Sequence, residues 1–209
     1  MALFIVFEGG EGCGKSTQTR ALCRRLSRDG FGAVLTREPG GTRLGERVRH
    51  HLKRTGEAQI SPLAELFLIA TARAQLVSEI IRPELERGRT VICDRFTPST
   101  LAYQGYGRGL DTEAIRDVND IATDGISPDL IVLLDMPVEA GLSRKKSRER
   151  DRFESESLAF HSRVRRGYLD LAKADPRRWL VVDGLLPKKA IESTIWARVS
   201  VLLRQGPDA

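Results

Sequence analysis

The architecture of this chain follows from residues 9–16, which read Gly9-Gly10-Glu11-Gly12-Cys13-Gly14-Lys15-Ser16. They match the pattern G-x-x-x-x-G-K-[ST], follow the apolar run Leu3–Phe7 and open an amphipathic segment. Between a strand and a helix, such glycines let backbone N–H groups surround a phosphate, and the helix N-terminus adds partial positive charge. The stretch therefore predicts a P-loop that binds nucleotide phosphates, in preference to a chance glycine-rich turn.

The side chains of this loop have distinct expected roles. Lys15 should reach the β- and γ-phosphates, and the Ser16 hydroxyl should ligate Mg²⁺. Cys13 is either a small residue that fits the turn or a thiol open to alkylating agents. The residues expected to hold the nucleotide are Gly9, Gly10, Glu11, Gly12, Cys13, Gly14, Lys15, Ser16 and Thr17.

Outward from the loop, apolar runs alternate with longer helical segments. The runs predicted as strands are Leu3–Phe7, Ala33–Thr36, Thr90–Cys93, Leu130–Leu134 and Trp179–Val182. The predicted helices are Ser16–Asp29, Leu44–Arg54, Pro62–Arg87, Thr112–Thr123, Ser155–Lys173 and Lys188–Arg204. This alternation predicts an α/β fold of three layers, a five-stranded parallel sheet with helices on both faces. Without repeats or linkers, we expect one domain over residues 1–209.

Composition narrows the class of protein. Of the 209 residues, 41% are hydrophobic, which is enough for a core, yet no stretch is apolar for the roughly 18 residues that span a bilayer. The start MALFIVFEGGEG does not resemble a signal peptide. Three cysteines are too few for a disulfide framework. We therefore expect a cytoplasmic globular protein that does not bind membranes.

The net charge of +6 is concentrated in one segment. Residues Ser143–Arg152 contain six basic and two acidic side chains, a net charge of +4, which leaves +2 for the rest of the chain. A nucleic-acid-binding protein spreads its phosphate contacts over a wider face. This distribution argues against nucleic acid and favours a small, highly charged ligand, although such a run can also be a solvated surface.

Two further motifs follow the second and third predicted strands. Residues 36–42 read TREPGGT, and residues 94–109 read DRFTPSTLAYQGYGRG. Both lie where ligands bind in open α/β sheets, at the carboxyl ends of the strands. A P-loop alone is compatible with a GTPase switch, an ATP-driven regulator, a kinase or a non-catalytic nucleotide-binding module. The chain lacks the N-K-x-D pattern that reads guanine.

These motifs, with DRFE at Asp151–Glu154, resemble the thymidylate kinase family over nearly the whole chain. The resemblance implies transfer of the ATP γ-phosphate to dTMP, giving ADP and dTDP, a step of dTTP synthesis. It also implies Mg²⁺ and a homodimer, in which the apolar helix around Leu66–Val77 would be buried by the core and by a second subunit. The alternative within the class is a kinase for another pyrimidine or deoxynucleoside monophosphate.

The resemblance also assigns roles to residues. Asp94 would hold Mg²⁺ with Ser16, or else cap a turn, and Arg95 would act in catalysis and on the acceptor phosphate. Arg73 would bind the acceptor, or else form a structural salt bridge, because a buried guanidinium needs a partner. The Tyr103 ring would exclude a ribose hydroxyl. The residues expected around dTMP are Glu11, Glu38, Arg49, Ile69, Arg73, Arg95, Ser99, Thr100, Tyr103 and Gln104.

One position departs from the family pattern. The base usually stacks on a Phe four residues before the helix arginine, and this chain has Ile69 there. Phe67 faces another direction on a regular helix. Either Ile69 packs on the thymine alone, or another ring substitutes, or base preference is altered.

The basic segment is expected to form a small lid over residues 143–153, as in the bacterial type that carries its basic residues there. The P-loop offers no cation after Glu11, because the next residue is Gly12. Arg148 best matches the catalytic arginine of the lid, which would neutralise charge developing in the transition state. Arg144, on the ATP side, and Arg152 are secondary candidates.

Overall fold

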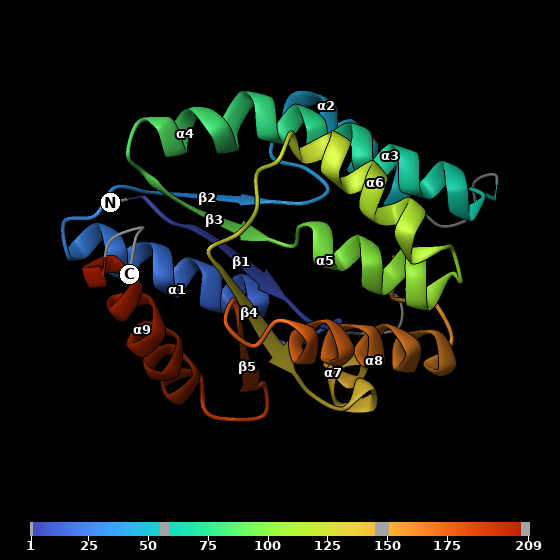
Figure 1. The fold of residues 1–209 in the computed structure, drawn as a ribbon. Helices are drawn as coiled ribbons and strands as arrows, with labels where there is room; N and C mark the ends of the chain where they lie inside the picture. Colours follow the sequence, from blue (N-terminus) through green and yellow to red (C-terminus); the bar gives the residue numbers. More distant parts are fainter. Residues whose placement is uncertain (1, 55–58, 145–150, 206–209) are drawn as a thin grey trace.

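The computed structural model describes residues 2–54, 59–144 and 151–205. Its centre is a parallel sheet with the strand order β2-β3-β1-β4-β5 (Figure 1). The strands are β1 Phe4–Glu8, β2 Ala33–Arg37, β3 Thr90–Asp94, β4 Leu130–Asp135 and β5 Trp179–Asp183. The prediction of a five-stranded parallel sheet is confirmed.

Every strand ends one residue later than its apolar run. The final residues are Glu8, Arg37, Asp94, Asp135 and Asp183. The hydrophobic pattern stops where the helices no longer cover the strand, but the backbone ladder continues into a polar residue. Five charged side chains therefore stand together at the carboxyl edge of the sheet.

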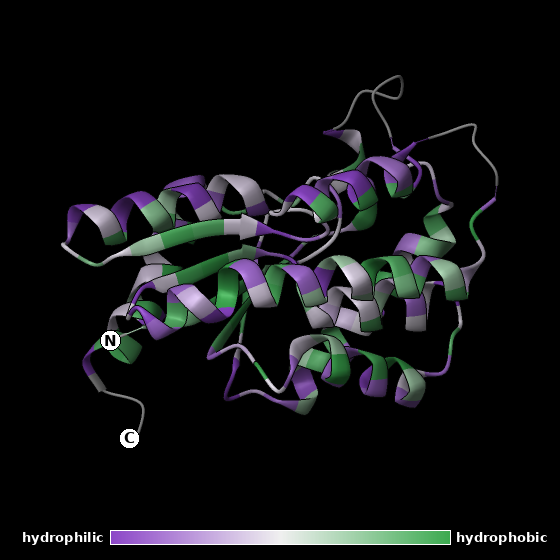
Figure 2. Ribbon diagram, turned by 90° about the horizontal axis from the view of Figure 1, so that it is seen from above, coloured by the Kyte–Doolittle hydropathy of each residue, from purple (hydrophilic) through white to green (hydrophobic). Residues whose placement is uncertain are grey.

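Helices cover both faces of the sheet (Figure 1). Helices α1 and α9 pack on one face, and the other face is covered by α3, η1, α5, η2 and α8. In Figure 2 the strands run between these layers as mainly hydrophobic segments. The helices are α1 Lys15–Arg28, α2 Arg43–Lys53, α3 Pro62–Leu76, η1 Val77–Ile81, α4 Arg82–Glu86, α5 Thr97–Thr100, η2 Leu101–Gly107, α6 Thr112–Thr123, α7 Val138–Ser143, α8 Leu158–Ala174 and α9 Lys188–Gln205.

The long helix predicted over Pro62–Arg87 is divided into three parts. It begins as expected, because the Ser61 hydroxyl accepts a hydrogen bond from the Ala64 N–H. Before Pro83 the helix widens into the π-helical turn η1 and then continues as α4. Proline cannot donate a backbone hydrogen bond, and the wider turn lets the helix bend without ending.

Three short helical segments, α5, η2 and α7, were not among the predicted helices. Gly105 and Gly107 lower the helix propensity of the segment 97–107, whereas Pro98 lies in the first turn of α5, where proline is tolerated. Tertiary packing overrides that preference, because Gly107 lies against the Phe160 ring of α8, where a Cβ would leave too little room. Helix α8 itself begins at Leu158 rather than Ser155, because Ser157 caps it by accepting from the Phe160 N–H.

Among the helices of the described residues, none is long and apolar enough to cross a bilayer.

Candidate active site

A cavity of about 440 Å³ opens at the carboxyl edge of the sheet. Its walls come from the P-loop, the ends of β2 and β3, helices α2, α3, α5 and η2, and residues 151–154. The predicted site residues that line it are Glu11, Gly12, Cys13, Gly14, Lys15, Ser16, Thr17, Glu38, Arg49, Ile69, Arg73, Asp94, Arg95, Ser99, Thr100, Tyr103, Gln104 and Arg144. Gly9 and Gly10 lie behind this wall, and Arg148 lies outside the described residues.

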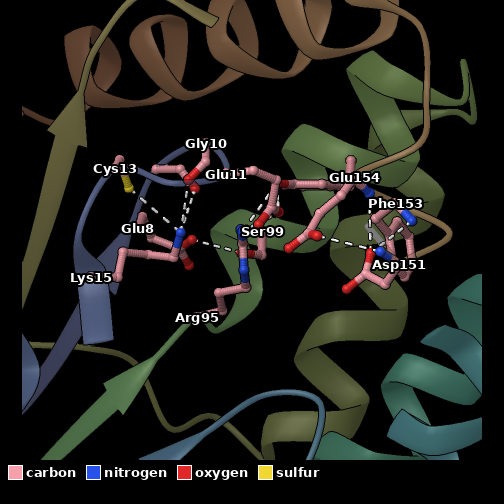
Figure 3. A network of polar contacts seen from close by, with 12 residues as sticks. Glu8, Gly10, Glu11, Cys13, Lys15, Arg95, Ser99, Asp151, Phe153 and Glu154 are labelled. Atoms are coloured by element: carbon pink, nitrogen blue, oxygen red, sulfur yellow. Dashed lines mark hydrogen bonds and ion pairs between the residues drawn. The ribbon is translucent and has the colours of Figure 1, made fainter. Parts of the chain in front are cut away.

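The P-loop folds around its own lysine (Figure 3). The Lys15 ammonium donates to the carbonyl oxygens of Gly9 and Gly10, at 3.0 and 2.9 Å, and lies 3.5 Å from the Cys13 sulfur. Gly14 precedes α1 in a left-handed conformation, with φ of 96°, which glycine adopts without strain. The loop thus presents its backbone and one cation to the cavity.

The structure explains why position 12 carries no cation. Gly12 has φ of 68°, and a Cβ there would overlap the carbonyl oxygen of Gly141 in α7. An arginine at this position would therefore displace α7. The Arg144 guanidinium, one residue after α7, instead approaches from outside and donates to the Gly12 carbonyl oxygen at 3.1 Å.

Ser16 and Asp94 face each other at the donor end of the cavity. The Ser16 hydroxyl donates to Asp94 Oδ2 at 2.8 Å. One residue begins a helix and the other ends β3, so the sheet brings them together across 78 positions of sequence. The Asp94 carboxylate accepts from this hydroxyl, and its two alternative roles, magnesium ligand or turn cap, stay predictions.

Arg95 is held in a strained conformation by several partners. It has φ of 76°, which is uncommon for a residue with a side chain. Its guanidinium donates to Glu11 Oε1 at 2.6 Å, and to the hydroxyls of Tyr103 and Tyr168, each at 3.0 Å. The guanidinium also donates a hydrogen bond to the Ser99 hydroxyl at 3.2 Å. This network fixes the guanidinium plane in the wall of the cavity.

Glu11 is ionised at neutral pH. Burial opposes its ionisation, but the nearby charges of Arg95 and Lys15, with a hydrogen bond from the Tyr103 hydroxyl, lower its pKa to about 2. The site therefore holds a fixed carboxylate beside the Arg95 cation over the physiological pH range.

Glu8 is a site residue that the sequence analysis missed. Its side chain is completely buried, lies between Lys15 and Arg95 in Figure 3, and accepts from the Phe96 N–H and from the hydroxyls of Ser99 and Tyr168, at 2.9, 2.6 and 2.8 Å. Burial raises the pKa of this carboxyl group. The sequence did contain a signal for Glu8, because it is an acidic residue directly after an apolar strand and before the P-loop. Its partner Tyr168 has no such local signal in the sequence.

Arg73 forms the salt bridge that was its alternative role. The side chain is only 1% exposed, and Nε and Nη2 both donate to Glu38 Oε2, at 2.9 and 2.5 Å. Nη1 donates to Asn119 and Nη2 to Thr100. Glu38 thus neutralises the buried arginine, and both side chains remain part of the cavity wall.

Glu65 connects three other parts of the wall and was also missed. This buried carboxylate accepts from Gln104 Nε2 at 2.7 Å, from Arg108 Nε and Nη2 at 3.2 Å, and from Arg152 Nη2 at 2.5 Å. Gln104, which also lines the cavity, is held by this bond from its amide nitrogen, and its predicted contact with the thymine stays a prediction.

Arg49 and Ile69 complete the cavity wall at the end formed by α2 and α3. The Arg49 guanidinium donates to the Pro39 carbonyl oxygen at 3.0 Å, and burial together with the charge of Arg37 lowers its pKa. Ile69 packs with Val48 and Leu52. An apolar patch therefore lies beside a cation at this end.

The fold and the site together define a P-loop kinase of the nucleoside monophosphate type, with the phosphate loop at one end of the cavity and an arginine-rich acceptor wall at the other. The family model "Thymidylate kinase" matches residues 7–195. The chain therefore belongs to the thymidylate kinase family.

Individual relatives agree with this assignment over the whole chain. It is 51% identical over 203 residues to a thymidylate kinase of Dehalococcoides mccartyi, covering 97% of this chain and 98% of the relative. It is 49% identical to that of Thermomicrobium roseum, covering 99% and 98%. Among solved structures, thymidylate kinase from Ehrlichia chaffeensis superposes with a TM-score of 0.78 at 34% identity, covering 95% of this chain and 98% of that chain.

The pairing of Glu38 with Arg73 generates a stability prediction. Glu38→Ala should lower the free energy of unfolding by about 3–5 kcal/mol, because it leaves a buried guanidinium without its carboxylate. Glu38→Leu combined with Arg73→Met removes both charges and should cost less. Urea unfolding followed by tryptophan fluorescence measures the free energy of unfolding of the single and the double variant.

Glu46→Ala is the matched control, because its ion pair with Arg37 is exposed and its loss should cost at most about 1 kcal/mol. Equal losses for Glu38→Ala and Glu46→Ala would contradict a buried, stabilising pair.

Proposed function

We propose that this chain transfers the γ-phosphate of ATP to dTMP, giving ADP and dTDP, as a step of dTTP synthesis in the cytoplasm. One observation carries the proposal: a single cavity joins a P-loop to a wall containing Arg49 and Arg95, in a chain of the thymidylate kinase family. Its three cysteines form no disulfide, which supports a reducing compartment.

ATP would occupy the donor end of the cavity. The loop residues 9–17 would surround its phosphates, and Lys15 would exchange the carbonyl oxygens of Gly9 and Gly10 for phosphate oxygens. Arg144, already on the Gly12 carbonyl oxygen, lies at the same end.

The oxygens of Ser16 and Asp94 fit a magnesium ion. They are hard ligands 2.8 Å apart, and Mg²⁺ is usually held by one or two such groups together with substrate phosphates and water. The absence of a cluster of three acidic, histidine or cysteine ligands among the described residues agrees with that mode. When bound, the ion would neutralise phosphate charge.

dTMP would occupy the acceptor end. Its phosphate would lie against Arg95 and Arg49, which line the cavity. Glu11 and Tyr103 would face the sugar, and Thr100 and Gln104 would lie towards the base beside Ile69. Arg73, Glu38 and Ser99 would mainly hold this wall in place, because their polar atoms bind protein groups.

The chemistry in this site is positioning and charge neutralisation. Phosphoryl transfer requires little covalent chemistry from the protein. Fixed cations that face the transferred phosphoryl group therefore provide most of the catalytic effect. Arg95 is fixed before the substrate arrives by Glu11, Tyr103 and Tyr168. We expect Arg148 to add the lid cation.

A coupled ADP-release assay over dTMP, dUMP, dCMP and dGMP tests the substrate. We expect the highest kcat/KM for dTMP and little ADP release without an acceptor. Lys15→Ala controls for contaminating kinases and should be inactive. Preference for another monophosphate would select the alternative kinase, and acceptor-independent ADP release would indicate an ATPase.

Tyr103 should set the preference for deoxyribose. Its ring is fixed edge-on by Phe153 and Phe160, with centroids 6.0 Å away in both cases, so it cannot readily yield to a 2′-hydroxyl. Tyr103→Ala should lower the ratio of kcat/KM for dTMP over its ribonucleotide about tenfold. Tyr103→Phe keeps the ring and should retain the ratio. An unchanged ratio in Tyr103→Ala would remove this role.

We further propose that two copies of the chain associate through α3 and α6. These helices pack side by side (Figure 1) and expose Leu63 and Phe67, each 52% accessible, and Ile121, 82% accessible. Exposed large apolar side chains on neighbouring helices are typical of a subunit interface.

The replacements Phe67→Lys and Ile121→Lys should convert a dimer to a monomer in sedimentation equilibrium, because burying an unpaired ammonium is costly. Leu158→Lys changes an equally exposed leucine on α8 and should leave the dimer intact. A monomeric wild-type chain would refute this assembly.

A further inference from the structure

Phe153 lies in the cavity wall at the acceptor end (Figure 3). Its ring is half-buried and packs against two hydrophobic clusters, one containing Ile69 and the other Tyr103. The Tyr103 and Phe153 rings meet edge-on, with centroids 6.0 Å apart and an interplanar angle of 80°. Phe153 therefore bridges the apolar patch around Ile69 and the aromatic group around Tyr103.

Ion pairs of the two preceding residues, Asp151 and Arg152, fix the position of this ring. Asp151 pairs with the Lys53 ammonium at the end of α2, at 2.5 Å. Arg152 donates to the Leu52 carbonyl oxygen at 2.9 Å and to the buried Glu65 carboxylate at 2.5 Å. The backbone N–H of Phe153 donates to Asp151 Oδ1 at 3.0 Å. These contacts, which we call the clamp, hold residues 151–153 against helices α2 and α3.

Phe153 is also the aromatic side chain best suited to covering a flat ligand. Among the described residues that line the cavity, only Tyr103 and Phe153 are aromatic. The Tyr103 hydroxyl is bonded to Glu11, and its ring lies 4.9 Å from the Arg95 guanidinium carbon. Phe153 has no polar atom to satisfy, and Ile69 beside it offers only branched aliphatic carbon.

We propose that Phe153 covers the pyrimidine ring of the acceptor nucleotide and, with Ile69, forms the apolar slot that selects a flat base. The proposal deepens the proposed function, on which it rests, because it requires the acceptor base at the end of the cavity near Ile69 and Gln104. Contact between an aromatic ring and a base hardly distinguishes one base from another. Phe153 therefore sets the affinity for the acceptor, while polar groups at the edge of the base select which base is bound.

The clamp also links the position of Phe153 to that of Gln104. Glu65 accepts from Gln104 as well as from Arg152, so one carboxylate positions both the ring and an amide of the acceptor wall. Loss of the Arg152 pair should therefore mimic loss of the ring on the acceptor side.

Steady-state kinetics of Phe153→Leu tests the proposal. KM for dTMP and for dUMP should each rise about fivefold, with KM for ATP unchanged, because only the acceptor base loses a stacking surface. Phe153→Tyr should restore KM. Phe31→Leu makes the same change at an exposed ring outside the cavity and should match the wild type.

A contact with the base can be separated from general support of the cleft. Calorimetric affinity for dTMP should fall in Phe153→Leu, while affinity for 2-deoxyribose 5-phosphate, which lacks the base, should not. Equal loss for both ligands, a parallel rise in KM for ATP, or a KM for dTMP within twofold of wild type would overturn the proposal. Wild-type protein inactive on dTMP would instead refute the proposed function.

Discussion

The arrangement of the site depends on Arg95 and the two carboxylates around it. Glu11 pairs with its guanidinium in the cavity wall, and Glu8 is bonded to the same Ser99 and Tyr168 hydroxyls. Neither buried carboxylate would be tolerated without a nearby cation, and the cation would not hold a left-handed backbone without them. Because these bonds form during folding, little reorganisation remains for the moment when an anionic substrate binds.

Buried ion pairs also connect the helical layer to the sheet. The Glu38–Arg73 pair connects the end of β2 with α3, and Glu65 connects α3 with η2 and with Arg152. Buried ion pairs add little net stability compared with apolar packing, but they penalise any arrangement that separates them. They therefore restrict this wall of the cavity to one geometry, which under the proposed function would help to align the acceptor phosphate.

The sequence predicted the fold, and it revealed the P-loop motif, because both are encoded locally. The strands are continuous apolar runs, and residues 9–16 are contiguous, so spacing alone reveals them. Glu8, Glu65 and Tyr168 could not be found in this way, because each acts through partners far along the chain, Glu8 and Tyr168 being 160 residues apart. The segment 97–107 was missed because Gly105 and Gly107 lower its helix propensity, while the packing against α8 that supports the helix involves residues far along the chain.

The residues on either side of 145–150 contact two different parts of the cavity. Arg144 is bonded to the Gly12 carbonyl oxygen of the P-loop, and Arg152 to the Leu52 carbonyl oxygen and Glu65 of the acceptor wall. Gly12 must lack a side chain because α7 packs directly on it, so this position of the P-loop cannot supply an arginine. Under the proposed function, the lid cation would come from the basic segment whose described ends, Arg144 and Arg152, contact the P-loop and helices α2 and α3. Close packing at Gly12 is the reason that position 12 itself cannot carry this charge.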